Sequence, residues 1–226
     1  MERLLAYKNL AKKEYLDGRY FNLVFKDQPG LVRKPLVIRV TQGETRIVTP
    51  DLGFRMDPET EFYIIRVILE VGDNEGRTLS RHSNVVIIDN ILKRVLRFEP
   101  LSGISSPDVN KVISATLRPF FKGYFYVESS AHPQTLDAAN GLCVAYIIKF
   151  TAFYLAREAV VFEGELDIHN FANAVVELYG NLPEQGKDIE FGPGGFGLGF
   201  LGGALIGTAI AAPLIASAAA PRYYYI

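Results

Sequence analysis

A histidine and a glutamate, His82 and Glu99, stand at the outer ends of one predicted β-hairpin. Residues 85–88 form a continuous run of apolar β-branched side chains, which is typical of a strand buried on both faces. A second strand is predicted over residues 93–98, and an Asp-Asn pair between the two runs supplies the turn. If the hairpin closes on residues 90–91, paired residue numbers sum to 181. His82 then lies directly opposite Glu99, with Cβ atoms about 5 Å apart on one face.

An imidazole beside a carboxylate is one half of a nucleophilic triad. In such a triad the carboxylate fixes the tautomer of the histidine and stabilises its protonated form. The simpler interpretation is a cross-strand charge pair at the rim of a sheet. Spacing alone favours this simpler interpretation. The triad interpretation also requires a nucleophile, which has to come from another part of the chain.

Composition limits what the hairpin can belong to. The chain has 226 residues, 49% of them hydrophobic and 22% charged, which is enough for one core of roughly 180 to 190 residues. The net charge of −1, with both signs mixed along the chain, excludes the electrostatic pattern of a nucleic-acid-binding protein. Cys143 is the single cysteine, so no internal disulfide can form, and folding in a reducing compartment is expected. The first 15 residues lack a signal-peptide core.

The remaining elements are predicted from periodicity and turn residues. Residues 2–17 have the three-to-four spacing of an amphipathic helix. Further strands and one helix are predicted from β-rich runs, turn signals and a Ser-Ser-Pro-Asp helix start: strands over 21–25, 35–40, 45–48, 61–71 and 123–128, and a helix over 105–117.

Residues 136–158 are apolar on nearly all sides and predict a buried central helix, from about residue 139 to 156. The charged residues Asp137, Lys149 and Arg157 within this run favour a core helix over a membrane span. An amphipathic helix over residues 167–179 follows and ends at Gly180. The predicted fold class is α+β, with a mainly antiparallel sheet and a buried central helix in a domain spanning residues 1–187.

Three segments together resemble a known family. The sequence HSNVVIIDNILKRVLRFEP from His82, then Gln134, then ANGLCVAY around Cys143 resemble the adenovirus-proteinase and Ulp-type (SUMO-deconjugating) cysteine peptidases of the papain-like superfamily. Within that superfamily, the sequence is most similar to protease-like proteins of large nucleocytoplasmic DNA viruses. The resemblance covers about residues 62–157. It implies a papain-like fold in which His82 is the base, Glu99 the orienting acid and Gln134 an oxyanion-hole donor.

The position of the nucleophile leaves two alternatives. In this family the glutamine precedes the cysteine by six or seven residues, and that spacing leads to Asn140, which is followed by a glycine as the family's cysteine commonly is. The thiol is then replaced by an amide, the site is inactive, and Cys143 is a buried helix residue. Alternatively, Cys143 is the nucleophile in the first turn of the helix, where the dipole and His82 lower its pKa. We slightly favour the inactive site, because Ser83 stands where the peptidases typically carry tryptophan.

The C-terminal tail, residues 188–226, differs from the rest of the chain. Residues 191–221 contain no charged side chain, and residues 196–212 would rise about 25 Å as a helix. Small residues recur there at every fourth position, a spacing suited to close helix packing in a membrane: Gly199, Gly203, Gly207 and Ala211. Arg222 and the three tyrosines after it predict an interfacial anchor. We favour membrane insertion over a flexible arm threaded between neighbouring proteins.

Three functions remain compatible with the sequence. The favoured one is a minor structural virion protein of a large DNA virus, associated with capsid or internal membrane, built on an inactive cysteine-protease-like domain and held by its tail to membrane or capsid proteins. The alternative is an active membrane-anchored viral cysteine peptidase or isopeptidase that uses Cys143, His82 and Glu99 on a polypeptide substrate. A cellular membrane-associated adaptor is the third. No cofactor is expected. His132 and His169 are interpreted as ordinary surface or loop residues, so no metal site is predicted.

Overall fold

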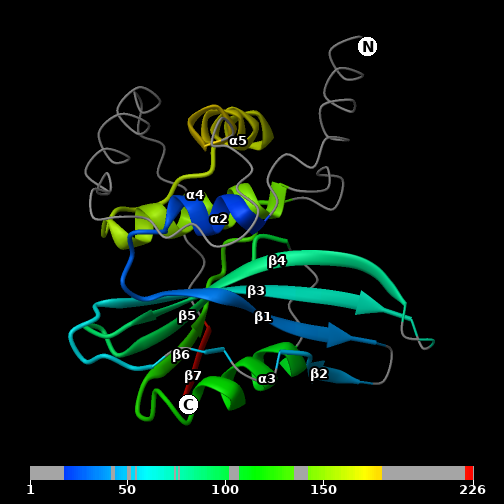
Figure 1. Cartoon of the computed structure of the whole chain (residues 1–226), viewed down its shortest axis with the longest axis vertical. Helices are drawn as coiled ribbons and strands as arrows, with labels where there is room; N and C mark the ends of the chain where they lie inside the picture. The colour runs from blue at the N-terminus through cyan, green and yellow to red at the C-terminus, as the bar shows by residue number, and fades with distance from the viewer. Residues whose placement is uncertain are drawn as a thin grey trace.

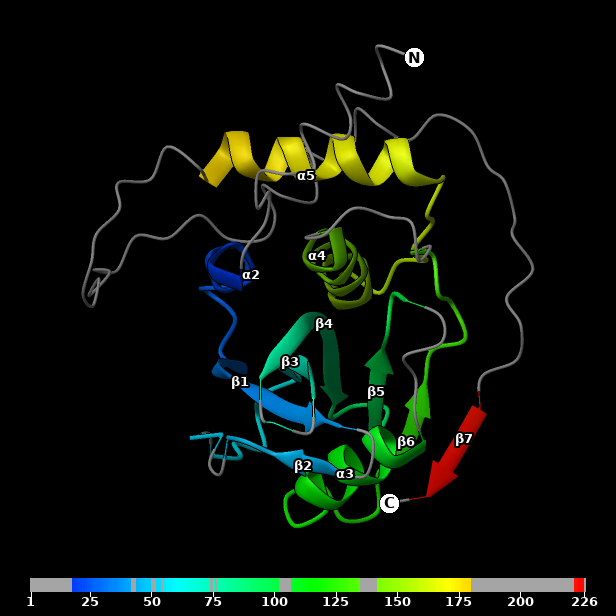
Figure 2. The same cartoon turned by 90° about the vertical axis from the view of Figure 1, so that its right-hand side faces the viewer.

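The computed structural model describes residues 18–41, 44–49, 52–53, 55–73, 75, 77–101, 107–134, 142–179 and 222–225. These residues form a mixed α/β structure in which helices cover both faces of one twisted sheet (Figures 1 and 2). The strands are β1 (Leu31–Val40), β2 (Thr45–Ile47), β3 (Phe62–Gly72), β4 (Thr78–Asp89), β5 (Arg94–Phe98), β6 (Phe125–Glu128) and β7 (Arg222–Tyr225). The helices are α2 (Gly18–Val24), α3 (Pro107–Leu117), α4 (Leu142–Leu155) and α5 (Glu165–Tyr179). The helix expected over residues 2–17 lies outside the described residues.

The sheet has the strand order β2-β1-β3-β4-β5-β6-β7. Neighbouring strands are antiparallel except in the pairs β1–β3 and β5–β6, which are parallel. The expectation of a mainly antiparallel sheet is therefore confirmed for the described strands. β3 and β4 lie at the centre, and all four side chains of the 85–88 run are fully buried, as predicted for a strand covered on both faces.

The β4–β5 hairpin has a different register from the one we predicted. Val85 pairs with Phe98, so paired residue numbers sum to 183 and not to 181. The turn is longer because the Asp89 carboxylate accepts hydrogen bonds from the backbone N–H groups of Ile91 and Leu92, at 3.1 and 2.9 Å. A shift of two residues keeps every side chain on its expected face, because side chains alternate with a period of two along a strand.

Helix α4 is the predicted central helix. It lies between the sheet and α5, and nearly all of its side chains are buried (Figure 2). It packs on β4 on one side, and α5 covers its other side with an apolar face of Ile168, Ala172 and Val175. Such all-round burial requires the uniformly apolar sequence that identified this helix.

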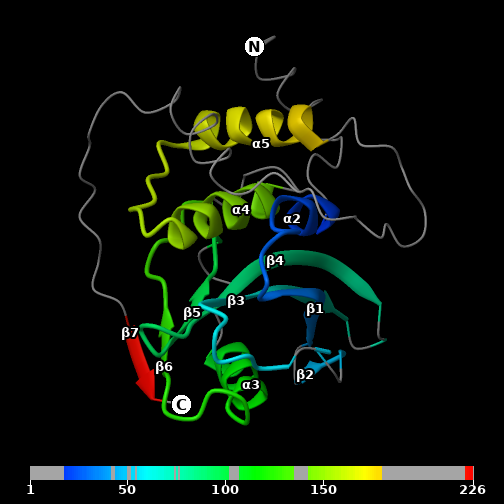
Figure 3. The same cartoon turned by 60° about the vertical axis from the view of Figure 1, so that its left-hand side comes forward.

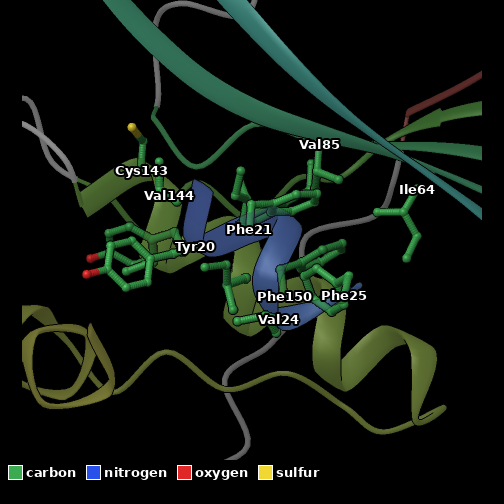
Figure 4. Close-up of a cluster of buried hydrophobic side chains, with 14 of the residues drawn as sticks. Tyr20, Phe21, Val24, Phe25, Ile64, Val85, Cys143, Val144 and Phe150 are labelled. Atoms are coloured by element: carbon green, nitrogen blue, oxygen red, sulfur yellow. The ribbon is translucent and has the colours of Figure 1, made fainter. Parts of the chain in front are cut away.

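One prediction in the N-terminal region was wrong. Residues 21–25 were expected to form a strand, but most of this run lies in helix α2. The apolar side chains of the segment, Tyr20, Phe21, Val24 and Phe25, fall on one side of a helix and join the cluster under α4 (Figure 4). Tertiary packing of this face outweighs the local preference of Phe and Val for a strand.

Helix α3 covers the opposite face of the sheet. Val109, Ile113 and Leu117 recur at the spacing of one helical face and are fully buried against β3, β4 and β6 side chains. The two hydrophobic clusters, one under α4 and one under α3, therefore enclose the central strands from both sides.

Residues 222–225, which were expected to lie at a membrane interface, form a β-strand. This strand, β7, pairs antiparallel with β6 at the edge of the sheet (Figure 3). Residues 180–221, and with them the four small residues at every fourth position, lie outside the described residues. Among the helices that are described, none has the length and apolarity needed to span a bilayer.

Candidate active site

The expected contact between His82 and Glu99 is present. Nε2 of His82 hydrogen-bonds Oε1 of Glu99, and both side chains are buried. Because of the two-residue register shift, Asn84 occupies the place opposite Glu99, and His82 lies diagonally across the two strands. The Asn84 amide donates to Oε2 of Glu99 at 2.7 Å.

The Glu99 carboxylate is held by four donors. His82 and the backbone N–H of Leu101, at 3.1 Å, bind Oε1. Asn84 and the Arg97 guanidinium, at 3.1 Å, bind Oε2. Burial alone would raise the pKa of Glu99, but the hydrogen bond and charge of His82, the charge of Arg97 and the Leu101 N–H lower it on balance. Glu99 is therefore ionised and fixed in orientation.

Arg97 extends this network to two further elements. Its side chain is fully buried and donates to Asn110 on α3 at 2.7 Å and to Glu128 on β6 at 3.4 Å. Asn110 in turn donates to Glu128 at 2.8 Å. A buried guanidinium shared by two carboxylates compensates the charge that Glu99 brings into the core.

Cys143 is the second residue of α4 and lies against His82. The thiol and the imidazole are hydrogen-bond partners, and the backbone N–H groups of Ser83 and Val144 also hydrogen-bond the sulfur. Since Nε2 of His82 is engaged by Glu99, Nδ1 is the ring nitrogen left for Cys143. Figure 4 shows Cys143 at one edge of the hydrophobic cluster, with its sulfur directed away from Tyr20.

Both members of this pair have shifted pKa values. Burial alone would raise the pKa of the Cys143 thiol, but the hydrogen bond and positive charge of His82 and the two backbone N–H groups lower it on balance. Burial alone would lower the pKa of His82, but Cys143 and Glu99 raise it to about 9. Both shifts favour a thiolate beside an imidazolium, which is the reactive form of a cysteine nucleophile.

Gln134 lies beside the end of the Glu99 strand. Its backbone N–H donates to the Pro100 carbonyl at 2.8 Å, and it forms a parallel bridge with Leu101. The side chain is buried, and its Oε1 has no hydrogen-bond partner among the described residues.

His132 lies in a loop, as expected, but its side chain makes a contact that was not predicted. Its ring is half-buried, and Nδ1 lies 2.7 Å from the backbone oxygen of Glu99. No sequence spacing indicates this contact, because it joins a loop to a strand end 33 residues earlier.

The structure brings His82, Glu99 and Cys143 together. It places Gln134 beside Leu101, two residues after Glu99. Asn140, the alternative nucleophile position, lies outside the described residues, and His169 is on α5. Asn84 and Arg97 were not predicted to belong to the site, although their polarity within otherwise apolar strands was a usable signal. In the described part of the chain, no group of three His, Cys, Asp or Glu side chains is arranged to hold a metal ion.

No protein-family model and no curated protein sequence matches this chain. Similar solved structures include the C-terminal Ulp1 protease domain in complex with Smt3, the yeast ortholog of SUMO, at 15% sequence identity and a TM-score of 0.31. That match covers 50% of this chain and 51% of the other, so this chain spans about half of the Ulp1 chain.

Two further similar structures come from chlamydiae. ChlaDub1 from Chlamydia trachomatis has 16% identity and a TM-score of 0.44, over 73% of this chain and 90% of that one. The effector protein ChlaDUB of Chlamydia abortus has 16% identity and a TM-score of 0.40, over 62% of this chain and 65% of that one. The chain is thus similar to Ulp-type cysteine peptidase structures, and at this level of similarity its function has to be argued from the geometry of the site.

Proposed function

We propose that this protein is a cysteine peptidase in which Cys143 is the nucleophile, His82 its proton partner and Glu99 the orienting carboxylate. The observation that carries the proposal is that Cys143, at the N-terminal end of a buried helix, lies close enough to His82 for the imidazole to lower the pKa of its thiol. A cysteine that served only to fill the core would have a raised thiol pKa, whereas the pKa of Cys143 is lowered.

The chemistry follows from the ion pair. The Cys143 thiolate attacks the carbonyl carbon of an amide, the S–C bond forms, and the carbonyl electron pair moves to oxygen. Nδ1–H of His82 then protonates the amine as the C–N bond breaks, which leaves a thioester on Cys143. His82, now neutral, takes a proton from a water molecule as the water oxygen attacks the thioester carbon. The C–S bond then breaks, the acid product is released, and the thiolate–imidazolium pair is restored.

Two groups of this chain support an oxyanion site. The backbone N–H of Cys143 falls among the first four of α4, and these groups have no acceptor within a helix. The Gln134 side-chain amide, buried at the end of the Glu99 strand, is the second donor. The resemblance of the sequence around His82, Gln134 and Cys143 to peptidases favours a polypeptide as the substrate.

This proposal takes the second of the two alternatives left open by the sequence. Cys143, and not Asn140, is favoured as the nucleophile because its sulfur is within hydrogen-bonding reach of His82. The structural virion role and the attachment to membrane or capsid through residues 188–226 stay predictions, as does the domain boundary at residue 187.

Acylation by a small activated ester tests the proposal without knowledge of the natural substrate. We expect p-nitrophenyl acetate to give a rapid release of one equivalent of nitrophenolate per chain, with an acetyl group on Cys143. Cys143→Ala should abolish this release, while Lys111→Ala, which changes an exposed side chain on α3, should leave it intact. Release by the natural protein at the same rate as by Cys143→Ala would overturn the proposal.

A further inference from the structure

We propose that His132 is a positioning residue that holds Gln134 in place as an oxyanion donor, an inference that rests on the proposed peptidase function. His132 does not reach the reacting atoms by any contact in the structure. It acts on the short segment of residues 132–134, and this segment carries Gln134 at its end.

The segment is fastened to the end of the Glu99 strand at two points. Nδ1 of His132 lies 2.7 Å from the Glu99 carbonyl oxygen, and the Gln134 N–H donates to the Pro100 carbonyl at 2.8 Å. Two fixed points two residues apart leave the backbone of Gln134 little freedom.

A third contact joins the segment to the nucleophile helix. The Tyr146 hydroxyl, one turn after Cys143 on α4, donates to the Pro133 carbonyl at 3.5 Å. The segment thus contacts both the residues that directly follow β5, where Glu99 lies, and helix α4, which carries Cys143 in its first turn.

The side chain of Gln134 makes its placement dependent on this backbone. Its Oε1 is buried and has no hydrogen-bond partner in the described ranges. A buried amide oxygen without a partner gives the side chain no anchor of its own, so the direction of the amide follows from where the segment lies. His132 is the one side chain of the segment shown to bind the Glu99 backbone.

The acceptor in this contact determines which ring nitrogen of His132 carries a proton. A carbonyl oxygen only accepts, so Nδ1 carries the proton and donates it. The neutral Nδ1–H tautomer and the protonated ring can both donate this bond. Glu99 consequently orients two groups at once, His82 through its carboxylate and the Gln134 segment through its carbonyl.

Two reagents separate positioning of the oxyanion donor from activation of the thiol. Acylation by p-nitrophenyl acetate passes through a tetrahedral oxyanion, whereas alkylation by iodoacetamide displaces iodide from an sp³ carbon and forms none. Loss of one oxyanion donor lowers acyl transfer by about 10²- to 10³-fold, so a misplaced donor in His132→Ala should lower acylation by roughly tenfold or more. The rate of iodoacetamide alkylation and its pH dependence should be those of the natural protein.

Two isosteric variants make the test specific. Counted in bonds from Cβ, the amide nitrogen of asparagine lies as far away as Nδ1 of histidine. The amide nitrogen of glutamine lies as far away as Nε2 of histidine. His132→Asn should therefore restore acylation, and His132→Gln should resemble His132→Ala. In a Gln134→Ala background, His132→Ala should cause no further loss, because both changes remove the same donor.

Equal losses of acylation and alkylation in His132→Ala would overturn the inference, as would additive effects with Gln134→Ala. If His132→Ala does not fold, equal acylation by the asparagine and glutamine variants would overturn it. Failure of the natural protein to acylate at all would instead contradict the proposed function.

Discussion

Two buried carboxylates, Glu99 and Asp89, lie at opposite ends of the layer formed by β4 and α4, and each binds a cationic side chain. Both residues are fully buried. Glu99 lies near the start of α4, since it binds His82, the partner of Cys143, whereas Asp89 ends β4 and binds Arg157, just beyond the last turn of α4. The two ends differ in whether the cation can release its proton.

At the Asp89 end, the guanidinium of Arg157 stays charged and the hydroxyl of Tyr154 keeps its proton at neutral pH. Asp89 accepts hydrogen bonds from the Arg157 guanidinium and, at 3.0 Å, from the Tyr154 hydroxyl. Burial alone would raise the pKa of Asp89, but Arg157, the Leu92 N–H and Tyr154 lower it on balance. A guanidinium is not deprotonated in proteins, so this pair fixes the end of the helix and can take no part in proton transfer.

At the Glu99 end there are two cations, the Arg97 guanidinium and the His82 imidazole, and the pKa of His82 is raised to about 9. The carboxylate stabilises the protonated ring, and the ring stabilises a thiolate. Comparison of the two ends teaches that a buried carboxylate–cation pair becomes reactive only where the cation is titratable and a third group can share its proton.

The largest expected effect separates the two ends directly. His82→Asn removes the cation beside Cys143, so the pKa of the thiol should rise and its thiolate fraction at pH 7 should fall to about 1%. The smaller thiolate fraction slows iodoacetamide alkylation, and the higher nucleophilicity of a more basic thiolate offsets only part of this loss. The alkylation rate at pH 7 should therefore fall by roughly tenfold or more. Asp89→Asn is the matched control and should alkylate at the natural rate. Similar rates for His82→Asn and the natural protein would show that His82 does not activate the thiol.

The next effect concerns the free energy of unfolding. Glu99→Gln keeps the shape of the side chain but leaves the buried Arg97 with one carboxylate fewer, and breaking a buried pair costs about 3–5 kcal/mol. Loss of the negative charge also destabilises the imidazolium, so the pKa of His82 should fall below about 9. Urea denaturation measures the first change and NMR titration of the ring the second. A loss of stability no larger than that of Asp89→Asn would remove the distinction between the two carboxylates.

Asp89→Asn should have a smaller effect on stability, about 1–2 kcal/mol. The Arg157 side chain is 37% exposed and can be hydrated, and an asparagine oxygen can still accept from the turn N–H groups. The pKa of Asp89 is lowered from its ordinary value of 3.8, so its stabilisation is present above that value and is lost as pH falls through the lowered one. The difference in unfolding free energy between natural protein and variant should therefore shrink in acid. A difference that grows as pH falls would have the wrong sign.

Tyr154→Phe should give the smallest change. It removes the hydrogen bond that the Tyr154 hydroxyl donates to the Asp89 carboxylate and the one that it accepts from Arg94, but leaves the Arg157 guanidinium in place, which should cost about 1 kcal/mol of unfolding free energy. The pH dependence of Cys143 alkylation should be unaffected. A shifted alkylation profile would mean that the two ends of α4 are coupled.

The elements predicted best from the sequence are those with strong periodicity. The run at 85–88 and the uniformly apolar α4 were found because burial on all sides leaves a continuous apolar signature. The His82–Glu99 contact was found although the register was wrong, because an even shift preserves the face of a strand.

The residues that were not predicted from the sequence depend on tertiary contacts. His132 meets a backbone carbonyl and Arg97 meets α3 and β6, and neither contact has a local pattern. The strand at residues 222–225 was also not predicted, because a short aromatic run fits both a membrane interface and the edge of a sheet, and its pairing with β6 joins segments far apart in the sequence.

The pH dependence of Cys143 alkylation by iodoacetamide tests the central claim most directly, because Cys143 is the only cysteine and its product is unambiguous. If it is paired with His82, the rate should rise with a midpoint below the ordinary thiol pKa of 9.0. A further change should appear near pH 9, where His82 loses its proton. A single rise with its midpoint at or above 9.0 would show an ordinary thiol and contradict the assignment of Cys143 as the nucleophile.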